Sequence, residues 1–211
     1  MINVQIDLLT HTPEPLRVLW TATRTCKSSK TPQELWSDYP GDDVAIRLLH
    51  AIWHAKHYSI FEHVTLTYAV TDVSRILLAQ YTRHRIGINV SVQSGRSVQQ
   101  EEKSFYFPGK HKTYGKATAD IKEIANWAVA DAFGYYEQLL KLGVRKEDAR
   151  YVLPQGCTVN MITTLNLRSL WDVYQKRVQA PGAQAEIKTM VQYMVDRTLD
   201  ELPWMRELYD V

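Results

Sequence analysis

Apolar and polar residues alternate in two parts of the chain, residues 4–8 and residues 64–70, and this period of two predicts β-strands. Residues 157–166 are rich in threonine, valine and isoleucine, which also favours a strand. Residues 104–108 have the aromatic content of a short strand. We therefore expect a small sheet, either mixed or antiparallel.

Helical spacing of apolar residues accounts for much of the remaining chain. Capping and breaking residues set the expected ends, as at the Thr31–Glu34 capping box, with Asp72 and Asn166 as further N-caps. The expected helices are residues 16–26, a short helix after Thr31, residues 42–56, 73–85, 117–142, 146–153 and 167–177, and a long helix from about Gln184. A glycine-bearing loop is expected after Gly87.

The longest expected helix, residues 117–142, has an apolar stripe that should face the core. Its members are Ile121, Ile124, Trp127, Ala128, Ala132, Tyr135 and Leu139. Strands and helices interleave with neither a regular βαβ rhythm nor an internal repeat. We therefore expect an α+β fold: one domain, residues 1–211, with a small sheet flanked by long helices.

The composition is that of an ordinary globular protein, with 45% apolar and 23% charged residues. A formal charge of only +2 argues against a general nucleic-acid binder. No stretch approaches the ~20 apolar residues of a membrane span, and the first residues lack the features of a signal peptide. We expect no nucleic-acid or membrane partner and a cytoplasmic location. Cys26 and Cys157 are too isolated for a disulfide framework or a thiolate metal site.

Residues 73–100 contain no Asp, Glu or Lys, yet they contain four arginines: Arg75, Arg83, Arg85 and Arg96. Cations in a last helical turn complement the negative end of the helix, which would easily explain one of Arg83 and Arg85. That explanation does not cover the other two arginines, the missing acids or the nearby Ser91, Gln93 and Ser94. Because a guanidinium group binds phosphate or carboxylate through two parallel hydrogen bonds, we expect this stretch to hold phosphates.

The sequence gives weaker evidence for other candidate site residues. His50 and His54 have a spacing that two metal ligands can share, but no nearby carboxylate or thiol completes a site, so we expect no metal. Cys157 has no visible basic partner, which favours a buried, unreactive thiol. Ser59 and Glu62 have capping-box spacing, yet the strand pattern that follows leaves them free for a ligand. Arg177 shares the apolar face of its helix and either extends to solvent or projects towards a ligand.

The segment "RHRIGINVSVQSGR" resembles the signature of the flavin-dependent thymidylate synthases: Arg83-His84-Arg85, then eight residues, then Ser94. The likeness continues in order through "ATRTCKSS", "HYSIFEHVTLTYAVTDVSRILLAQYTRHR", "EDARYVLP", "NLRSLWDVYQKR" and "AQAEI", and so covers nearly the whole chain. The resemblance implies a homotetramer with active sites between subunits. It implies methylation of dUMP to dTMP, with methylenetetrahydrofolate as carbon donor, FAD reduced by NADPH, and no cysteine nucleophile.

The resemblance also assigns residues. Those matching FAD-binding positions are Ser59, Arg83, His84, Arg85, Asn166 and Arg168. Those matching dUMP-binding positions are Gln80, Arg83, Gln93, Ser94, Gly95, Arg96, Arg150 and Arg177, with Val92 as the alternative to Gln93. Arg177 matches the arginine that activates the uracil ring, where a fixed guanidinium group can stabilise the developing negative charge.

Two segments depart from the family pattern. Ser97 stands where members usually carry an aromatic residue, and "QAPGAQ", which contains Pro181 and Gly182, stands where they often carry a histidine. A flavin-dependent enzyme that hydroxymethylates dUMP is therefore an alternative. A non-enzymatic module that binds single-stranded RNA is the alternative from another class, although the low net charge argues against it.

Overall fold

A computed structural model describes residues 4–102, 104–108 and 120–209 of the chain. Four strands form one sheet in the order β1-β2-β4-β3, and every neighbouring pair is antiparallel. The strands are β1 Gln5–His11, β2 Thr65–Ser74, β3 Ile88–Val92 and β4 Thr158–Asn166. The expected α+β class is confirmed, and the sheet is antiparallel rather than mixed.

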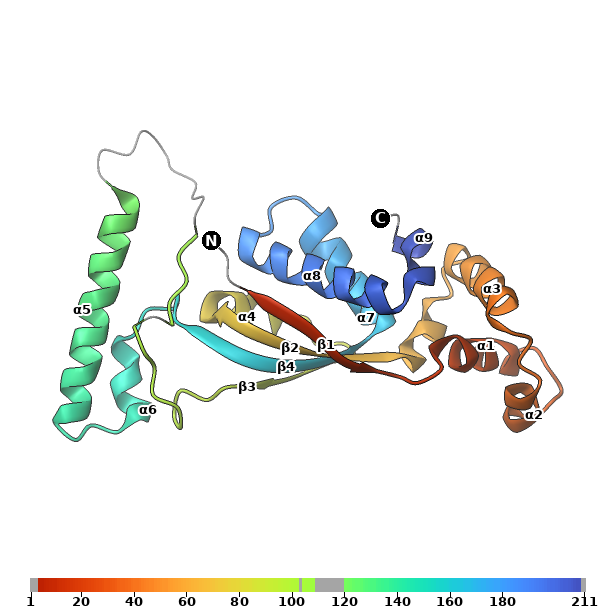
Figure 1. Cartoon of the computed structure of the whole chain (residues 1–211), viewed down its shortest axis with the longest axis horizontal. Coiled ribbons are helices and arrows are strands. Elements are labelled where there is room, and N and C mark those ends of the chain that lie inside the picture. The colour runs from red at the N-terminus through yellow and green to blue at the C-terminus, as the bar shows by residue number, and fades with distance from the viewer. Residues whose placement is uncertain (1–3, 103, 109–119, 210–211) are drawn as a thin grey trace.

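The helices gather on one face and at both ends of the sheet (Figure 1). Those in the described residues are α1 Pro15–Thr25, α2 Pro32–Ser37, α3 Asp42–His54, α4 Arg75–Tyr81, α5 Ile121–Lys141, α6 Lys146–Ala149, α7 Leu167–Tyr174, α8 Ala185–Glu201 and α9 Arg206–Tyr209. Short 3₁₀ turns η1 Tyr58–His63, η2 Arg150–Val152 and η4 Pro203–Met205, and a π-helical turn η3 Gln175–Gln179, complete the list.

The main core lies between the sheet and helices α4, α7 and α8. Alternate residues of β2, namely Leu66, Tyr68 and Val70, are buried against these helices, as the period-two pattern predicts. The side chains between them lie on the other face of the sheet, which no helix covers in Figure 1. The alternation along the strands therefore determines which face the helices cover.

The strand β2 is longer than its alternating pattern indicates. A bulge between Val70 and Val73 places Asp72 in the left-handed region, at φ 59°, after which pairing with β4 resumes. The expectation that Asp72 caps the next helix is therefore wrong. Ser74 is the N-cap, and its hydroxyl accepts a hydrogen bond from the Leu77 amide.

Three further assignments are also wrong. The expected glycine-bearing loop contains the strand β3, which pairs with the edge of β4. The alternation of isoleucine and valine with Asn89 and Ser91 is the sequence pattern that indicates this strand. Residues 104–108 form no strand but only an isolated bridge between Phe105 and Cys157. The expected helix 73–85 ends at Tyr81, so the three residues Arg83 to Arg85 follow it rather than close it.

Helices α5 and α6 stand at one end of the sheet with a small core of their own (Figure 1). The helix α5 buries Val129, Phe133 and Tyr136. Much of the stripe expected to face inward points outward instead: Ile124 is 52% exposed, and Trp127 and Tyr135 are each 60% exposed. The prediction of the buried face of α5 was wrong because this helix packs against η2 and α6 rather than on the sheet. Residues 117–119 of the expected helix lie outside the described residues.

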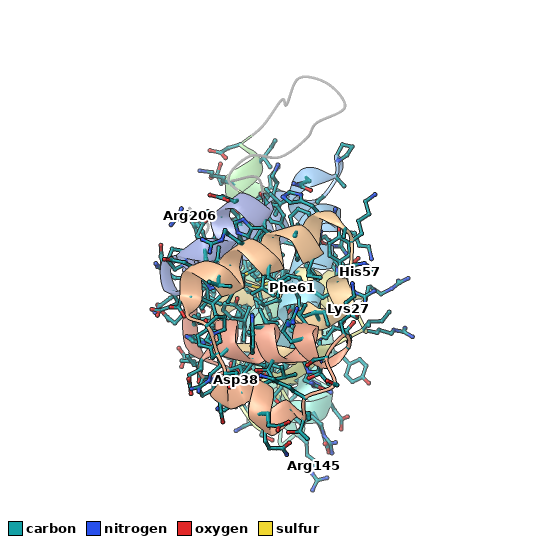
Figure 2. All side chains as sticks on the ribbon, turned by 90° about the vertical axis from the view of Figure 1, so that its right-hand side faces the viewer. Lys27, Asp38, His57, Phe61, Arg145 and Arg206 are labelled. Atoms are coloured by element: carbon teal, nitrogen blue, oxygen red, sulfur yellow. The ribbon has the colours of Figure 1, made fainter. Side chains whose placement is uncertain are left out.

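The opposite end of the sheet is built from α1, α2, α3 and η1 (Figure 1). Phe61 of η1 is buried against Trp53 of α3, with ring centroids 4.8 Å apart, and lies within this end when it is viewed along the long axis (Figure 2). The turn that carries Ser59 and Glu62 is thereby held on the core. Within the described parts of the chain, no helix is long and apolar enough to cross a membrane.

Candidate active site

Arg177 lies in the π-helical turn that continues α7, and two acceptors from the segment around α4 hold its guanidinium group. Its Nε donates to Nε2 of His84 at 2.9 Å, and its Nη2 donates to the backbone carbonyl of Gln80 at 3.0 Å. The sequence predicted a plain helix to this point. The wider π turn changes the direction of the side chain, and such turns are frequent at functional sites. Arg177 is partly buried and does not simply extend to solvent.

His84 accepts this hydrogen bond because a guanidinium group can only donate. The imidazole is therefore neutral and carries its proton on Nδ1. Burial lowers the pKa of His84, and the positive charges of Arg177 and Lys176 lower it further, against a smaller opposing effect of Asp172. The surroundings thus favour the neutral form of His84, which is the form that can hold Arg177.

Gln80 belongs to the same group of residues, since its carbonyl holds Arg177. Its side-chain amide donates to the side-chain oxygen of Gln184, just before α8. We call Gln80, His84 and Arg177 the Arg177 group. The structure brings these three predicted residues together, although their roles in binding a nucleotide or a flavin remain predictions.

A second group lies where the loop after β3 meets α6. The hydroxyl of Ser94 accepts from the Arg96 amide at 3.2 Å, and Gly95 is buried. The guanidinium group of Arg96 donates to Glu147 of α6 through Nε and Nη2, both at 3.0 Å. Arg150 follows α6, and its Nε donates to the Glu147 carbonyl at 3.1 Å. We call Ser94, Gly95, Arg96 and Arg150 the Gly95 group.

Glu147 is the residue of this region that the sequence analysis missed. It is the first residue of the quoted segment "EDARYVLP", but nothing in the local pattern signals that its carboxylate reaches Arg96 across more than 50 residues of chain. Gln93 also forms two hydrogen bonds with Asn160. The backbone amide of Gln93 donates to the backbone carbonyl of Asn160 at 2.8 Å, and the side-chain oxygen of Gln93 accepts from the backbone amide of Asn160 at 3.4 Å. Gln93 therefore extends the edge of the sheet towards the Gly95 group.

A third group surrounds the start of α7. Arg168 forms an ion pair with Glu62 of η1, and Ser59 is exposed in the same turn. Asn166 is the N-cap of α7, as predicted, with its side-chain oxygen accepting from the Ser169 amide at 2.8 Å. Glu62 is thus not free for a ligand, contrary to expectation, because it already pairs with Arg168.

Arg83 and Arg85 are exposed, and neither side chain has a hydrogen bond or ion pair with any described residue. Guanidinium groups without a carboxylate partner, together with the hydroxyl of Ser59 and the amide of Asn166, form a donor set suited to an anionic dinucleotide. The residues present therefore fit a cofactor such as FAD by their chemistry.

Cys157 and His50, the candidates for a nucleophile and a metal ligand, have structural surroundings instead. Cys157 is buried, and burial raises the pKa of its thiol to about 11, so the reactive thiolate is scarce near neutral pH. One ring nitrogen of His50 contacts the Trp204 carbonyl at 3.2 Å, and the other contacts Glu207 at 3.0 Å. Among the residues that the structure describes, no group of His, Cys, Asp and Glu side chains could hold a metal ion.

The Gly95 group and the group around Arg168 lie at opposite ends of the sheet. The Gly95 group adjoins the start of β4, and the group around Arg168 follows the end of β4. A strand of nine residues spans roughly 30 Å. In Figure 1, α6 and the 3₁₀ turn before β2 lie at opposite ends of the sheet. This separation is longer than a mononucleotide, so one such ligand could not reach both groups within one chain.

A sheet covered by helices on one face, together with guanidinium groups that have no acidic partner in the described part of the chain, is typical of an α+β protein that binds anionic ligands. Residues 7–204 match the family described as thymidylate synthase complementing protein. The chain belongs to this family, and it is an enzyme of the flavin-dependent thymidylate synthase type.

Curated relatives carry that name. The flavin-dependent thymidylate synthase of Geobacter sulfurreducens is 34% identical over 194 residues, which cover 91% of this chain and 81% of the relative. The synthase of Sulfolobus acidocaldarius is 30% identical over 193 residues, covering 92% and 72%.

Solved structures share the fold. The UMP/dUMP methylase PolB from Streptomyces cacaoi, bound with 5-Br dUMP, superposes with a TM-score of 0.82 at 22% identity and covers 99% of this chain and 95% of its own. Thymidylate synthase X from Helicobacter pylori, with FAD and dUMP, has a TM-score of 0.74 at 21% identity and covers 98% and 97%.

Proposed function

We propose that this enzyme methylates dUMP to dTMP, taking the one-carbon unit from methylenetetrahydrofolate and reducing equivalents from NADPH through FAD. The observation that carries the proposal is the fixed guanidinium group of Arg177 beside a neutral histidine. Nη1 of Arg177 has no hydrogen-bond partner among the described residues, so this side chain retains donors for a ligand.

Arg177 would stabilise the charge that develops on the uracil ring. For C5 of uracil to attack a carbon donor without a covalent thiol, negative charge must be stabilised at N3 and the adjacent carbonyl. A donor that is already fixed needs little reorganisation when that charge appears. His84 and the Gln80 carbonyl supply that fixation by occupying Nε and Nη2 of Arg177.

The Gly95 group would hold the nucleotide phosphate. Arg96 and Arg150 supply guanidinium groups, Ser94 supplies a hydroxyl, and the missing side chain at Gly95 allows a ligand or a neighbouring side chain to approach the backbone. Fixing the phosphate would orient the uracil ring towards Arg177. Gln93 would support this group from the edge of the sheet.

The residues that would hold FAD are Ser59, Arg83, His84, Arg85, Asn166 and Arg168. When bound, FAD supplies the hydride that completes the methyl group. The exposed guanidinium groups of Arg83 and Arg85 would bind its pyrophosphate. Because His84 already contacts Arg177, it would link the flavin site to the group that activates the uracil ring.

We further propose that residues 1–211 act as one domain in a cytoplasmic homotetramer whose active sites lie between subunits. The separation of the Gly95 group from Arg168 supports such sites, since residues of different copies would complete one pocket. The exposed Ile124, Trp127 and Tyr135 of α5 offer apolar area for contact between subunits.

The test is anaerobic incubation with dUMP, methylenetetrahydrofolate, FAD and NADPH, followed by mass analysis of the nucleotide. Formation of dTMP supports the proposal, and a hydroxymethylated nucleotide would replace it with the alternative chemistry. A purified protein that takes up no FAD would contradict both. Cys157→Ala belongs in the same assay: the buried thiol is not needed as a nucleophile, so a folded, flavin-bound variant should still form dTMP.

A further inference from the structure

Arg75 approaches the Gly95 group from a different element. It is the first residue of α4, and its Nη2 lies 2.9 Å from the point that a Cβ on Gly95 would occupy. Nη1 of Arg150 lies 3.6 Å from the same point. Both guanidinium groups therefore lie next to Gly95 and close to each other.

The backbone of Arg75 is held firmly in this position. Its amide donates to the Cys157 carbonyl at 3.1 Å. The preceding residue, Ser74, donates through its amide to Glu186 at 2.8 Å and through its hydroxyl to the second oxygen of the same carboxylate. The direction in which the Arg75 side chain leaves the helix is thus determined by contacts with β4 and α8.

The side chain of Arg75, by contrast, has no hydrogen bond or ion pair with any described residue, although it is partly buried. The nearby buried carboxylate, Glu186, uses its oxygens on Ser74. The carboxylate of the Gly95 region, Glu147, pairs with Arg96 and Arg145. Two guanidinium groups close together without a carboxylate between them repel each other, and an anion between them would remove that repulsion.

We propose that Arg75 is a further phosphate-binding residue, which together with Arg150 holds the nucleotide phosphate beside Gly95. This inference rests on the proposed nucleotide substrate. Arg96 joins them by exchanging its ion pair with Glu147 for the phosphate. Arg75 and Arg150 would then be available from the start, because, unlike Arg96, neither has a carboxylate to release among the described residues.

The test compares ligands with and without the phosphate. For wild type and Arg75→Gln, both loaded with FAD, we would measure the binding of dUMP, deoxyuridine and inorganic phosphate by titration calorimetry. Loss of a charge-assisted hydrogen bond should weaken dUMP binding by about 10- to 100-fold. Deoxyuridine binding should not change. Arg145→Gln is the matched control, since this 82% exposed arginine carries the same charge near the same loop and should leave dUMP affinity within about twofold.

Each outcome separates this inference from the proposed function. Unchanged dUMP binding in Arg75→Gln, or equal weakening of dUMP and deoxyuridine, would overturn the role of Arg75 while leaving the enzyme activity intact. Binding of inorganic phosphate that depends on Arg75, in a wild type that forms no dTMP, would retain the phosphate site and reject the proposed reaction. A wild type that binds neither dUMP nor phosphate would reject both.

A second variant checks the arrangement itself. In Gly95→Ala, the added Cβ would meet Nη2 of Arg75 and displace this flexible group, which should weaken dUMP binding. Combined with Arg75→Gln, the same change should have a smaller effect, because the group that it displaces is gone. Fully additive effects of the two changes would contradict the proposal.

Discussion

The contact between Arg177 and His84 depends on one proton. A neutral imidazole offers Nε2 as an acceptor, whereas a protonated imidazole has no acceptor and would repel the guanidinium group. Burial and the neighbouring cations Arg177 and Lys176 lower the pKa of His84, and Asp172 opposes them. Tyr81, whose ring centroid lies 6.4 Å from that of His84, faces it from the end of α4, and burial raises the pKa of this tyrosine to about 12, so it stays uncharged.

Replacing Arg177 should separate binding from activation. Arg177→Ala should keep its FAD, because the flavin contacts are assigned to other residues, yet methylation should slow by about 10² or more. Arg177→Lys should restore little, since lysine lacks the planar fork. The measurement is single-turnover flavin oxidation with dUMP and folate present, alongside dUMP titration of the flavin spectrum. Product formation at the wild-type rate in Arg177→Ala would remove Arg177 from the mechanism.

The rate should also report the protonation of His84. Because its pKa is lowered, the single-turnover rate should persist below the usual histidine range and fall only as His84 itself becomes protonated. The stability of the fold should also decrease as the pH falls. Because the pKa of His84 is lower in the folded than in the unfolded chain, the unfolded chain binds the proton at a higher pH. The contribution of His84 to stability is therefore lost as the pH falls below 6.5, the ordinary histidine value.

His84→Gln is the control for this prediction. Glutamine retains an acceptor oxygen for Arg177 but does not titrate, so this acid loss of rate should disappear while the flavin content is monitored. An unchanged acid limb in His84→Gln would assign the titration to another group.

At the scale of elements, α4 begins where two distant segments meet. Ser74 ends β2, caps α4 and donates two hydrogen bonds to Glu186 at the start of α8. The carboxylate thus ties the first turn of α8 to the junction of β2 and α4. This junction sets the direction of α4, and α4 in turn carries Arg75 at one end and Gln80 near the other.

Removing the Glu186 carboxylate should loosen this junction. Glu186→Ala leaves the buried Ser74 amide without its acceptor and should lower the free energy of unfolding by about 1–3 kcal/mol. Glu186→Gln retains one acceptor oxygen and should lower the free energy of unfolding by less. Burial raises the pKa of Glu186 against the opposing hydrogen bonds from Ser74, so the folded state binds the proton more tightly than the unfolded state.

The stability that Glu186 contributes should decrease as the pH rises. The contribution of Glu186 to stability is present below its ordinary value of 4.5 and is lost as the pH rises through the raised pKa. Thermal unfolding of wild type and Glu186→Gln across acid pH measures the difference. A stability gap between the two that does not change with pH would contradict this assignment.

At the scale of the whole molecule, α5 and α6 form an end unit with exposed apolar side chains. If these side chains bury themselves between subunits, a charge placed among them should weaken the assembly. Trp127→Glu should shift the mass measured by light scattering towards smaller species and lower activity. Lys141→Glu also places a glutamate on this helix, outside the apolar stripe, and should leave the mass unchanged even though it changes the net charge by two units instead of one.

Several features followed from the sequence by itself. Alternation along residues 64–70 marked the buried side chains of β2, and Asn166 marked the start of α7, because these signals act within a few residues. The arginine-rich stretch without acids, and the resemblance of Arg83 to Ser94 to a known signature, indicated the family.

Only the tertiary structure decided the rest. The bulge that moves the N-cap from Asp72 to Ser74, the outward stripe of α5 and the pairing of β3 all depend on which segments lie alongside each other. The same holds for Arg177 on His84, Arg96 on Glu147 and Arg75 beside Gly95. Such contacts join residues tens of positions apart, and their energies depend on burial and direction, which a linear pattern does not contain.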